Sequence, residues 1–161
     1  MTVKKGNNKT VVATFGAGCF WHVQAKFDKI KGVKNTYVGF MGGDLKNPTY
    51  EQTKTGQTGH AEVCHIEFDP EIVSYTDLLI SFWQMHDPTS LNRQGLDFGN
   101  QYRSVIFYHT ANQEKEAEKS LKEAQKNYKK PIVTQIVPAS EFYKAEEYHQ
   151  KYFEKTGKKV C

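Results

Sequence analysis

The chain is short of cysteine and of long apolar runs, and both shortages limit what it can be. Only three of its 161 residues are cysteines, Cys19, Cys64 and Cys161. No apolar signal-peptide core follows the basic N-terminal residues, and an odd number of cysteines does not suit a disulfide framework. No apolar stretch approaches the roughly 20 residues that span a bilayer. We therefore expect a cytoplasmic protein with free thiols and no membrane partner.

Charge of either sign is not in large excess. The chain has 22 Lys and Arg residues against 18 Asp and Glu residues, a balance that favours solubility and does not indicate a nucleic-acid partner. It has no internal repeat, no low-complexity tract and no linker. Its length suits one compact domain, which we place at residues 1–161, with a core that needs no disulfide staples. We expect this domain to act as a monomer.

Metal-binding motifs are also absent. The sequence contains neither C-x-x-C nor H-E-x-x-H. Cys19 and His22 are three residues apart, but Cys64 and His65 are neighbours on a predicted strand and point to opposite faces. We therefore expect no metal site and no thioredoxin-like redox pair.

Apolar periodicity predicts strands that alternate irregularly with helices. We expect strands at residues 10–16, 33–43, 60–70, 103–109 and 131–139. We expect helices from Phe20 to about residue 31, from Ser74 to about His86, from Thr110 to about Tyr128, and over residues 142–155. Residues 1–9 and 155–161 are predicted to be flexible tails. The order predicts an α/β (α+β) two-layer sandwich with one mixed sheet, a ferredoxin-like core and long loops.

Cys19 is the first candidate for chemistry, because it follows two glycines at the start of a predicted helix. The segment GAGCFW covers residues 16–21. A helix N-terminus carries about half a positive charge and free N–H groups, which stabilise a thiolate and lower the pKa of the thiol. Most free cysteines, however, are buried and behave as small apolar residues. Position alone therefore leaves two interpretations of Cys19 open, a reactive residue and a structural one. Phe20 continues the apolar stripe of the helix, whereas Trp21 lies off it.

Glu62 is the second candidate, because strand alternation places it on one face with Cys64, Ile66 and Phe68. A carboxyl group among apolar side chains is biased toward its protonated form and can donate a proton. The alternative is that Glu62 has a structural role and pairs with a lysine. Cys64 lies deeper in the strand, and we interpret it as a residue of the core.

Two polar loops, residues 44–59 and 87–102, exceed a dozen residues, a length that is more often functional than accidental. They carry Tyr50, Asp97 and Tyr102, and the tyrosines can donate hydrogen bonds to an oxygen-bearing substrate.

The motifs GCFW, NPTYE, GHAE and DFGNQYRS occur in this order, and the sequence resembles methionine sulfoxide reductase A from about Val11 to Cys161. The resemblance implies reduction of the S-epimer of methionine sulfoxide, free or in oxidised proteins and peptides, without a metal or organic cofactor. It implies that Cys19 is the nucleophile and that Glu62 donates a proton to the sulfoxide oxygen. The implied substrate-binding residues are Phe20 and Trp21 around the methyl group, and Tyr50, Asp97 and Tyr102 as polar partners.

The chemistry of a sulfoxide fits these residues. A sulfoxide is a poor electrophile until its oxygen is protonated, so the enzyme needs a thiolate, an acid and an apolar slot. Cys19, Glu62 and Trp21 can supply these three. Attack at sulfur leaves a sulfenic acid, which condenses with a second thiol to form a disulfide.

Cys161 is the expected second thiol. It ends a basic, glycine-containing segment that should be mobile enough to reach Cys19, and Lys158 and Lys159 should favour its thiolate. Cys64 is the alternative second thiol, although a rigid strand in the core cannot move to bring it to Cys19. The resemblance also favours Cys161, because relatives carry a resolving cysteine in this region, and it implies thioredoxin or another dithiol as the reductant.

The sequence departs from the family pattern at two positions, and it leaves two other functions to be considered. The family commonly has a small residue and a glutamate where this chain has His22 and Gln24, which could alter the electrostatics around the helix start. A cysteine hydrolase would need an oriented histidine base, and the sequence does not exclude His60 or His86. A basic RNA-binding module would stack exposed aromatics on its sheet, and no such signature stands in the strands.

Overall fold

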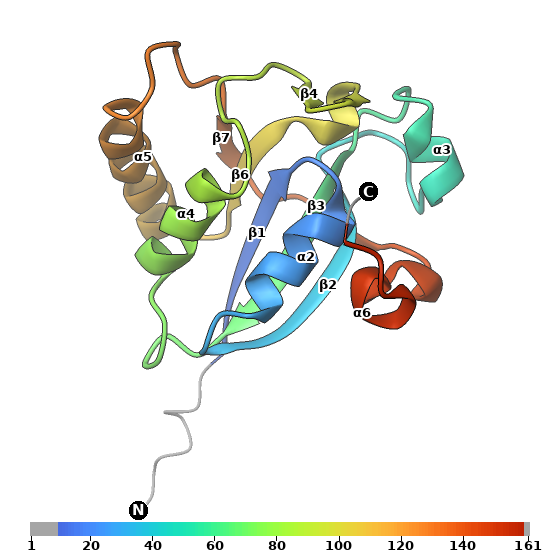
Figure 1. Ribbon diagram of the computed structural model, residues 1–161, viewed down its shortest axis with the longest axis horizontal. Coiled ribbons are helices and arrows are strands. Elements are labelled where there is room, and N and C mark those ends of the chain that lie inside the picture. The colour runs from blue at the N-terminus through green and yellow to red at the C-terminus, as the bar shows by residue number, and fades with distance from the viewer. Residues whose placement is uncertain (1–9, 160–161) are drawn as a thin grey trace, which may run out of the picture.

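The computed structural model describes residues 10–159 (Figure 1). The predicted N-terminal tail, residues 1–9, and the last two residues, Val160 and Cys161, lie outside this range. No helix among the described residues is long and apolar enough to cross a membrane.

The described part of the chain forms strands and helices in irregular alternation. The strands are β1 (Val11–Ala17), β2 (Val33–Met41), β3 (Ala61–Phe68), β4 (Arg93–Gln94), β5 (Asp97–Phe98), β6 (Ser104–Tyr108), β7 (Gln135–Pro138) and β8 (Tyr143–Lys144). The α-helices are α2 (Phe20–Asp28), α3 (Tyr50–Lys54), α4 (Tyr75–Gln84), α5 (Ala111–Gln125) and α6 (Tyr152–Thr156). Two short 3₁₀ helices are η1 (Asn100–Tyr102) and η2 (Glu147–His149).

Six of the strands form one sheet in the order β7-β6-β1-β3-β2-β8. The inner strands pair antiparallel, while β7 pairs parallel to β6, so the sheet is mixed. The chain order β1-α2-β2-β3-α4-β6 with the spatial order β6-β1-β3-β2 is the ferredoxin-like arrangement. The predicted two-layer fold with a mixed sheet is confirmed.

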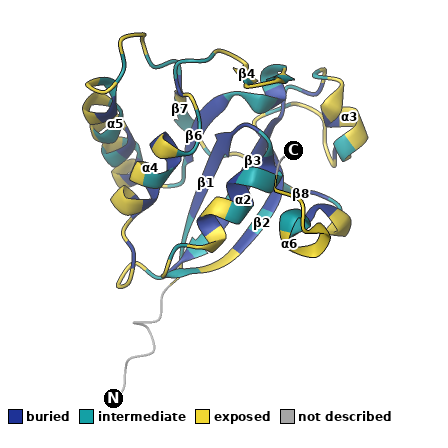
Figure 2. Cartoon of the chain, in the orientation of Figure 1, coloured by how far each residue is buried: buried dark blue, intermediate teal, exposed yellow. Residues whose placement is uncertain are grey.

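Helices α2, α4 and α5 cover one face of the sheet (Figure 1), and the main core lies between the two layers. Phe15 and Ile66 from the strands pack there with Phe27 of α2 and Phe82 of α4, all fully buried. Burying one such side chain contributes about 1.5–3 kcal/mol. Figure 2 shows the strands buried along most of their length and the outer sides of the helices exposed.

The other face of the sheet is covered as well. Val63, Val105 and Phe107 form a second buried cluster, against which Ala139 and Phe142 pack. Strand residues of both faces are therefore buried, and β3 is buried at almost every position. A sheet covered in this way does not present the exposed aromatic platform that the RNA-binding alternative requires.

Local sequence explains where several helices begin. Ser74 accepts a hydrogen bond from the Asp77 N–H while the Asp77 side chain accepts one from the Ser74 N–H, and this capping box confirms the predicted helix start at Ser74. Thr49 and Gln52 form another capping box at the start of α3. Thr110 caps α5 by accepting from the Gln113 N–H.

The prediction of one long helix over residues 142–155 is wrong. The segment instead forms β8, η2 and the short helix α6. Lys151 has a left-handed backbone with φ of 58°, which breaks any continuous right-handed helix at this residue. The apolar and aromatic spacing that suggested a helix arises because the segment packs against several different elements.

Other bounds also differ from the predictions: α2 ends at Asp28 and α5 at Gln125, each about three residues earlier than predicted. The last predicted strand, residues 131–139, is shortened to β7, with residues 131–134 in irregular structure. Helix α6 continues to Thr156, so the described structure includes the first residues of the predicted tail 155–161.

Gln150 and Lys151 fasten the C-terminal segment to the sheet and to α2. The Gln150 amide accepts from the Val38 N–H at 2.9 Å and donates to the Val38 carbonyl at 2.9 Å, as a neighbouring strand would. The Lys151 N–H donates to Gln24 Oε1 at 2.7 Å, and its ammonium group lies 2.8 Å from the Asp28 carboxylate.

Gln24 completes this attachment. Its side chain is 1% exposed, and its Nε2 donates to the carbonyl and the hydroxyl of Thr36, each at 3.1 Å. One amide therefore satisfies groups on β2 and on the C-terminal segment at the same time.

We predict that Gln24→Met lowers the free energy of unfolding by about 2 kcal/mol, because it leaves the Thr36 carbonyl and the Lys151 N–H without their buried partner. Urea unfolding measures the change. The matched control is Gln84→Met at an exposed position of α4, which should change stability by less than about 0.5 kcal/mol. Equal midpoints for the two variants would contradict the structural role of Gln24.

Candidate active site

Cys19 lies where β1 turns into α2, as the N-cap residue of that helix. Gly18 before it has φ of +95°, and a Cβ there would come within 2.9 Å of the Gln94 side chain. A Cβ on Gly16 would lie 2.7 Å from Val105 and 3.1 Å from the Glu62 carbonyl. The two glycines before Cys19 therefore allow a close approach of the neighbouring chain segments.

The start of α2 favours negative charge at Cys19. The helix has no acidic residue in its first turn, so nothing in that turn offsets the positive end of its dipole. A thiolate at this position is stabilised by the positive end of the helix dipole.

The two described cysteines differ in state. Cys19 is half-buried and disulfide-bonded in the structure. Cys64 is a free thiol with no exposed surface in the main core, so it is not the partner of Cys19. Burial raises the pKa of the Cys64 thiol well above its usual value. Cys161, the predicted resolving residue, lies outside the described residues.

Glu62 approaches the start of α2 from the neighbouring strand β3. Its side chain is 2% exposed, and its Oε1 accepts a hydrogen bond of 3.1 Å from the Phe20 N–H, next to Cys19 in the chain. Its Oε2 is buried and has no hydrogen-bond partner among the described residues. Burial raises the pKa of Glu62 to about 8, with a smaller increase from the charge of Asp97.

Tyr50, Asp97 and Tyr102 lie close enough to this carboxyl group for its charge and theirs to affect one another. Burial, followed by the charge of Glu62, raises the pKa of Tyr50 and that of Tyr102, which reaches about 12. Burial also raises the pKa of Asp97. Both tyrosines therefore keep their protons at neutral pH and can donate hydrogen bonds toward the space beside Glu62.

Hydrogen bonds join the two loops that carry these residues. The Asn100 amide of η1 donates to the Gly56 carbonyl at 3.2 Å, and the Gln101 amide donates to the Lys54 carbonyl at 3.2 Å. The hairpin of β4 and β5 holds Asp97 opposite Gln94, whose side chain packs against Gly18. The structure thus brings all the sequence-predicted site residues within the described range to one end of the sheet.

Aromatic side chains form a wall beside the thiol and the acid. Phe20 is 1% exposed, and its ring lies 6.0 Å from that of Tyr50 and 6.4 Å from that of Trp21, between centroids. Trp21 and Tyr50 are half-buried and their rings stack at 6.1 Å. An apolar wall of this kind suits a small methyl-bearing group.

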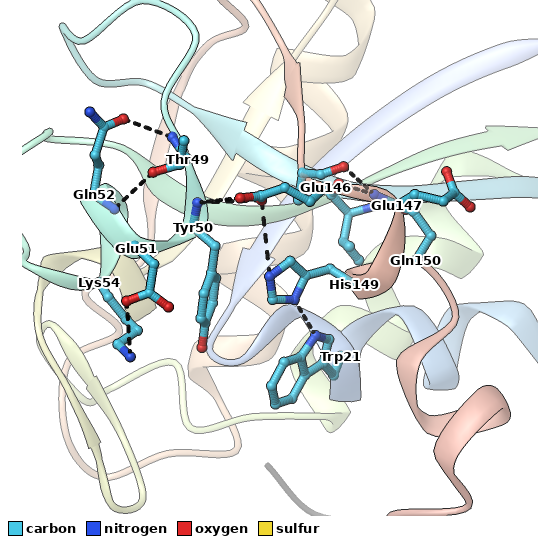
Figure 3. Close-up of polar contacts among 12 residues, drawn as sticks. Trp21, Thr49, Tyr50, Glu51, Gln52, Lys54, Glu146, Glu147, His149 and Gln150 are labelled. Carbon is cyan, nitrogen blue, oxygen red and sulfur yellow. Dashed lines mark hydrogen bonds and ion pairs between the residues drawn. The ribbon is translucent and has the colours of Figure 1, made fainter.

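The sequence analysis missed three residues that complete this wall. Figure 3 shows His149 between Glu146 and Trp21, with Tyr50 beside it. The Trp21 indole N–H donates to His149 Nδ1 at 3.0 Å, and the Tyr152 ring stacks on the indole at 3.9 Å. The motif YHQ, which joins a histidine to polar and aromatic neighbours, was the available signal, but the predicted long helix gave these side chains no common direction.

Neither histidine of the cysteine-hydrolase alternative is available as a base. The His60 ring lies between the Gly43 N–H at 2.9 Å and the Leu45 carbonyl at 2.7 Å. His86 bonds the Phe82 carbonyl and the Ser104 hydroxyl, each at 2.7 Å, and burial lowers its pKa to about 4. Both rings therefore connect loops and strands within the fold.

The departures at His22 and Gln24 add no charge near the thiol. Burial lowers the pKa of His22, which keeps it neutral at neutral pH. Gln24 is uncharged, and its amide is committed to Thr36 and Lys151. Among residues 10–159, no group of three or more His, Cys, Asp or Glu side chains is placed to hold a metal ion.

This geometry supports one kind of chemistry. A cysteine at a helix start lies beside a buried carboxyl group that is protonated at neutral pH, two tyrosine hydroxyls and an apolar wall. Such a site can deliver a nucleophilic sulfur and a proton to adjacent atoms of a small group that is polar on one side and apolar on the other.

Comparisons with known proteins agree with this reading. The model of the family described as peptide methionine sulfoxide reductase matches residues 11–161. The peptide methionine sulfoxide reductase MsrA of Methanothermobacter thermautotrophicus is 56% identical over 151 residues, which are 92% of this chain and 89% of that protein. Mxr1 from Saccharomyces cerevisiae in reduced form has a crystal structure with a TM-score of 0.91 at 32% identity, covering 99% of this chain and 92% of Mxr1.

A second crystal structure of Mxr1, in complex with Trx2, matches at 23% identity with a TM-score of 0.65 and covers 94% of this chain and 89% of Mxr1. That likeness shows the fold alone. The family match over nearly the whole chain and the high identity to the archaeal relative show more: the chain belongs to the peptide methionine sulfoxide reductase family.

Proposed function

We propose that this chain reduces the S-epimer of methionine sulfoxide, free or in oxidised proteins and peptides, to methionine. Family membership gives the reaction class. The observation that carries the proposal is Glu62, a buried carboxyl group with one oxygen anchored to the start of α2 and the other unpaired beside two tyrosines.

The first step transfers oxygen from substrate to enzyme. The Cys19 thiolate attacks the sulfoxide sulfur while Glu62 gives its proton to the sulfoxide oxygen. The attack joins the two sulfur atoms. The hydroxyl then bonds to the Cys19 sulfur as the sulfur–sulfur bond and the sulfur–oxygen bond of the substrate break, so the methionine thioether leaves and Cys19 becomes a sulfenic acid. The substrate sulfur gains two electrons and the Cys19 sulfur loses two. Glu62 then recovers a proton from solvent.

Binding of the sulfoxide follows from its two unlike ends. The methyl group packs against Phe20 and Trp21, while the oxygen accepts hydrogen bonds from Glu62 and from the hydroxyls of Tyr50 and Tyr102. Asp97 supports the protonated form of Glu62, because its negative charge raises the pKa of that carboxyl group. The site discriminates between the epimers because only one of them can place its methyl group against the aromatic wall and its oxygen against Glu62 at the same time.

The second step forms a disulfide. The Cys161 thiol condenses with the Cys19 sulfenic acid, forming one sulfur–sulfur bond and releasing water. Cys161 follows the segment that Lys151 fastens to α2, and it acts on Cys19 within a single catalytic domain, residues 1–161. A rigid β3 keeps Cys64 out of this step.

Thioredoxin completes the cycle as the electron donor. Its dithiol attacks the Cys19–Cys161 disulfide and leaves as a disulfide, returning both cysteines to thiols. The crystal complex of the related Mxr1 with Trx2 supports this assignment. We place the cycle in the cytoplasm, where the thioredoxin system keeps thiols reduced. We also propose that the enzyme acts as a monomer.

We predict that Cys19→Ser abolishes reduction of a methyl sulfoxide with dithiothreitol as reductant, because a serine hydroxyl cannot take up the oxygen and form a sulfenic acid. Cys64→Ala, at the free thiol of the core, should keep turnover. Both epimers are assayed by chromatography of the sulfide product. Measurable S-epimer reduction by the serine variant contradicts the mechanism.

We predict that Glu62→Gln lowers kcat/KM at neutral pH by roughly 10²–10⁴-fold, the usual contribution of general acid catalysis. The pKa of Glu62 is about 8, so the wild-type rate should also lose the acid form as pH rises through that value. The glutamine variant should lack this decline. Glu67→Gln on the same strand is the control, since Glu67 is half-exposed and bonds Asn35; an equal loss in both variants would return Glu62 to a structural role.

We predict that Cys161→Ser reduces about one sulfoxide per enzyme in a single-turnover assay and then stops with thioredoxin. Its Cys19 sulfenic acid has no resolving thiol, whereas dithiothreitol can attack it directly and restore turnover. Mass spectrometry of the wild-type enzyme after one turnover should show Cys19 linked to Cys161. A Cys19–Cys64 linkage, or full thioredoxin-dependent turnover in the variant, overturns the assignment.

A further inference from the structure

His149 holds the polar edge of Trp21. The indole N–H donates to His149 Nδ1 at 3.0 Å, and the imidazole is 1% exposed. A ring nitrogen that accepts a hydrogen bond carries no proton. The proton of neutral His149 therefore sits on Nε2, the nitrogen that faces Glu146.

Glu146 faces the protonated side of the ring and also contacts the other side of the aromatic wall. Its Oε1 lies 4.0 Å from His149 Nε2, which is longer than a hydrogen bond, so the carboxylate acts through its charge. Both of its oxygens accept from the Tyr50 N–H at 3.4 Å. Figure 3 shows this series of contacts from Tyr50 through Glu146 and His149 to Trp21.

The ring of His149 also packs against the faces of its neighbours. Its centroid lies 4.2 Å from that of Tyr50 and 5.6 Å from that of Phe20. Tyr152 stacks on Trp21 with an interplanar angle of 14°. Stacking fixes the plane of the indole, but it leaves rotation within that plane free, and the hydrogen bond to Nδ1 removes that freedom.

We propose that His149 is a positioning residue for sulfoxide reduction: as the Nε2–H tautomer favoured by Glu146, it fixes the Trp21 indole at the angle that closes the methyl-binding wall. This role rests on the proposed function, in which Trp21 contacts the sulfoxide methyl group. It acts on binding and reduction of the sulfoxide and leaves the later thiol exchange with thioredoxin unchanged.

The surroundings of His149 keep it in the required neutral form. Burial lowers its pKa, and the charges of Glu146 and Glu51 raise it by smaller amounts. A doubly protonated ring would present an N–H to the Trp21 N–H, and the hydrogen bond between them would be lost.

The test compares variants that keep or remove the acceptor at the Nδ1 position. His149→Asn places an amide oxygen there and should retain kcat/KM within about threefold, whereas His149→Leu should lower it about tenfold, the equivalent of one lost hydrogen bond. In a Trp21→Phe background, which has no indole N–H, the leucine change should cost little more. The rate of reduction of the oxidised enzyme by thioredoxin should be the same in His149→Asn, His149→Leu and the wild-type enzyme.

A measurement independent of activity follows the indole N–H itself by ¹H–¹⁵N NMR. The resonance of Trp21 should shift in His149→Leu and return toward its wild-type position in His149→Asn. Trp83, the other tryptophan, donates to the Ser120 hydroxyl at 2.8 Å and serves as the internal control, assigned with Trp83→Phe. The ¹⁵N spectrum of the His149 ring should show an unprotonated Nδ1.

If His149→Leu does not fold, His149→Gln replaces it, because its longer side chain carries its polar atoms near Nε2. Equal kcat/KM for the asparagine and glutamine variants would overturn the proposal, as would a leucine variant within twofold of wild type. An unmoved Trp21 resonance in the leucine variant also overturns it. Absence of reductase activity in the wild-type protein, with the NMR pattern intact, would instead overturn the proposed function on which the role rests.

Discussion

The hydrogen bond from the Phe20 N–H to the Glu62 carboxyl group holds the two ends of the chemistry together. It joins the first turn of α2, where Cys19 is the N-cap, to a buried position on β3. The backbone of Gly16 lies close to the Glu62 carbonyl because no side chain separates them. This one contact therefore sets the distance between Cys19 and Glu62, and the antiparallel pairing of β1 with β3 holds that distance in place.

The rest of the structure surrounds this contact from two directions. Loops carrying Tyr50, Asp97 and Tyr102 enclose the carboxyl group and raise its pKa by burial and charge. From the other side, three consecutive residues attach the C-terminal segment to separate elements: His149 to Trp21, Gln150 to β2, and Lys151 to α2. The segment that ends in Cys161 is thus fixed beside the site at residue 151, a short distance along the chain from the thiol it carries.

The sequence allowed the fold and the catalytic centre to be predicted where the signal was local. Strand alternation placed Glu62 with Cys64 and Ile66, and periodicity placed Cys19 after two glycines at a helix start; both are features of short segments. The C-terminal region could not be predicted this way, because its conformation depends on a left-handed Lys151 and on the Gln150 amide imitating a strand. The roles of His149 and Glu146 depend on contacts across the fold, to Trp21 and to Tyr50, which periodicity cannot reveal.

The burial that makes Glu62 an acid at neutral pH also weakens the fold. The pKa of Glu62 rises from its ordinary value of 4.5 to about 8, so between these values the folded chain binds more protons at this site than the unfolded chain does. Stability then falls as pH rises through this interval, and above it the deficit is constant. The unpaired Oε2 adds a further desolvation cost that only a bound oxygen could offset. The sheet, packed on both faces, supplies the stability that allows this carboxyl group to stay buried and protonated although Oε2 lacks a hydrogen-bond partner.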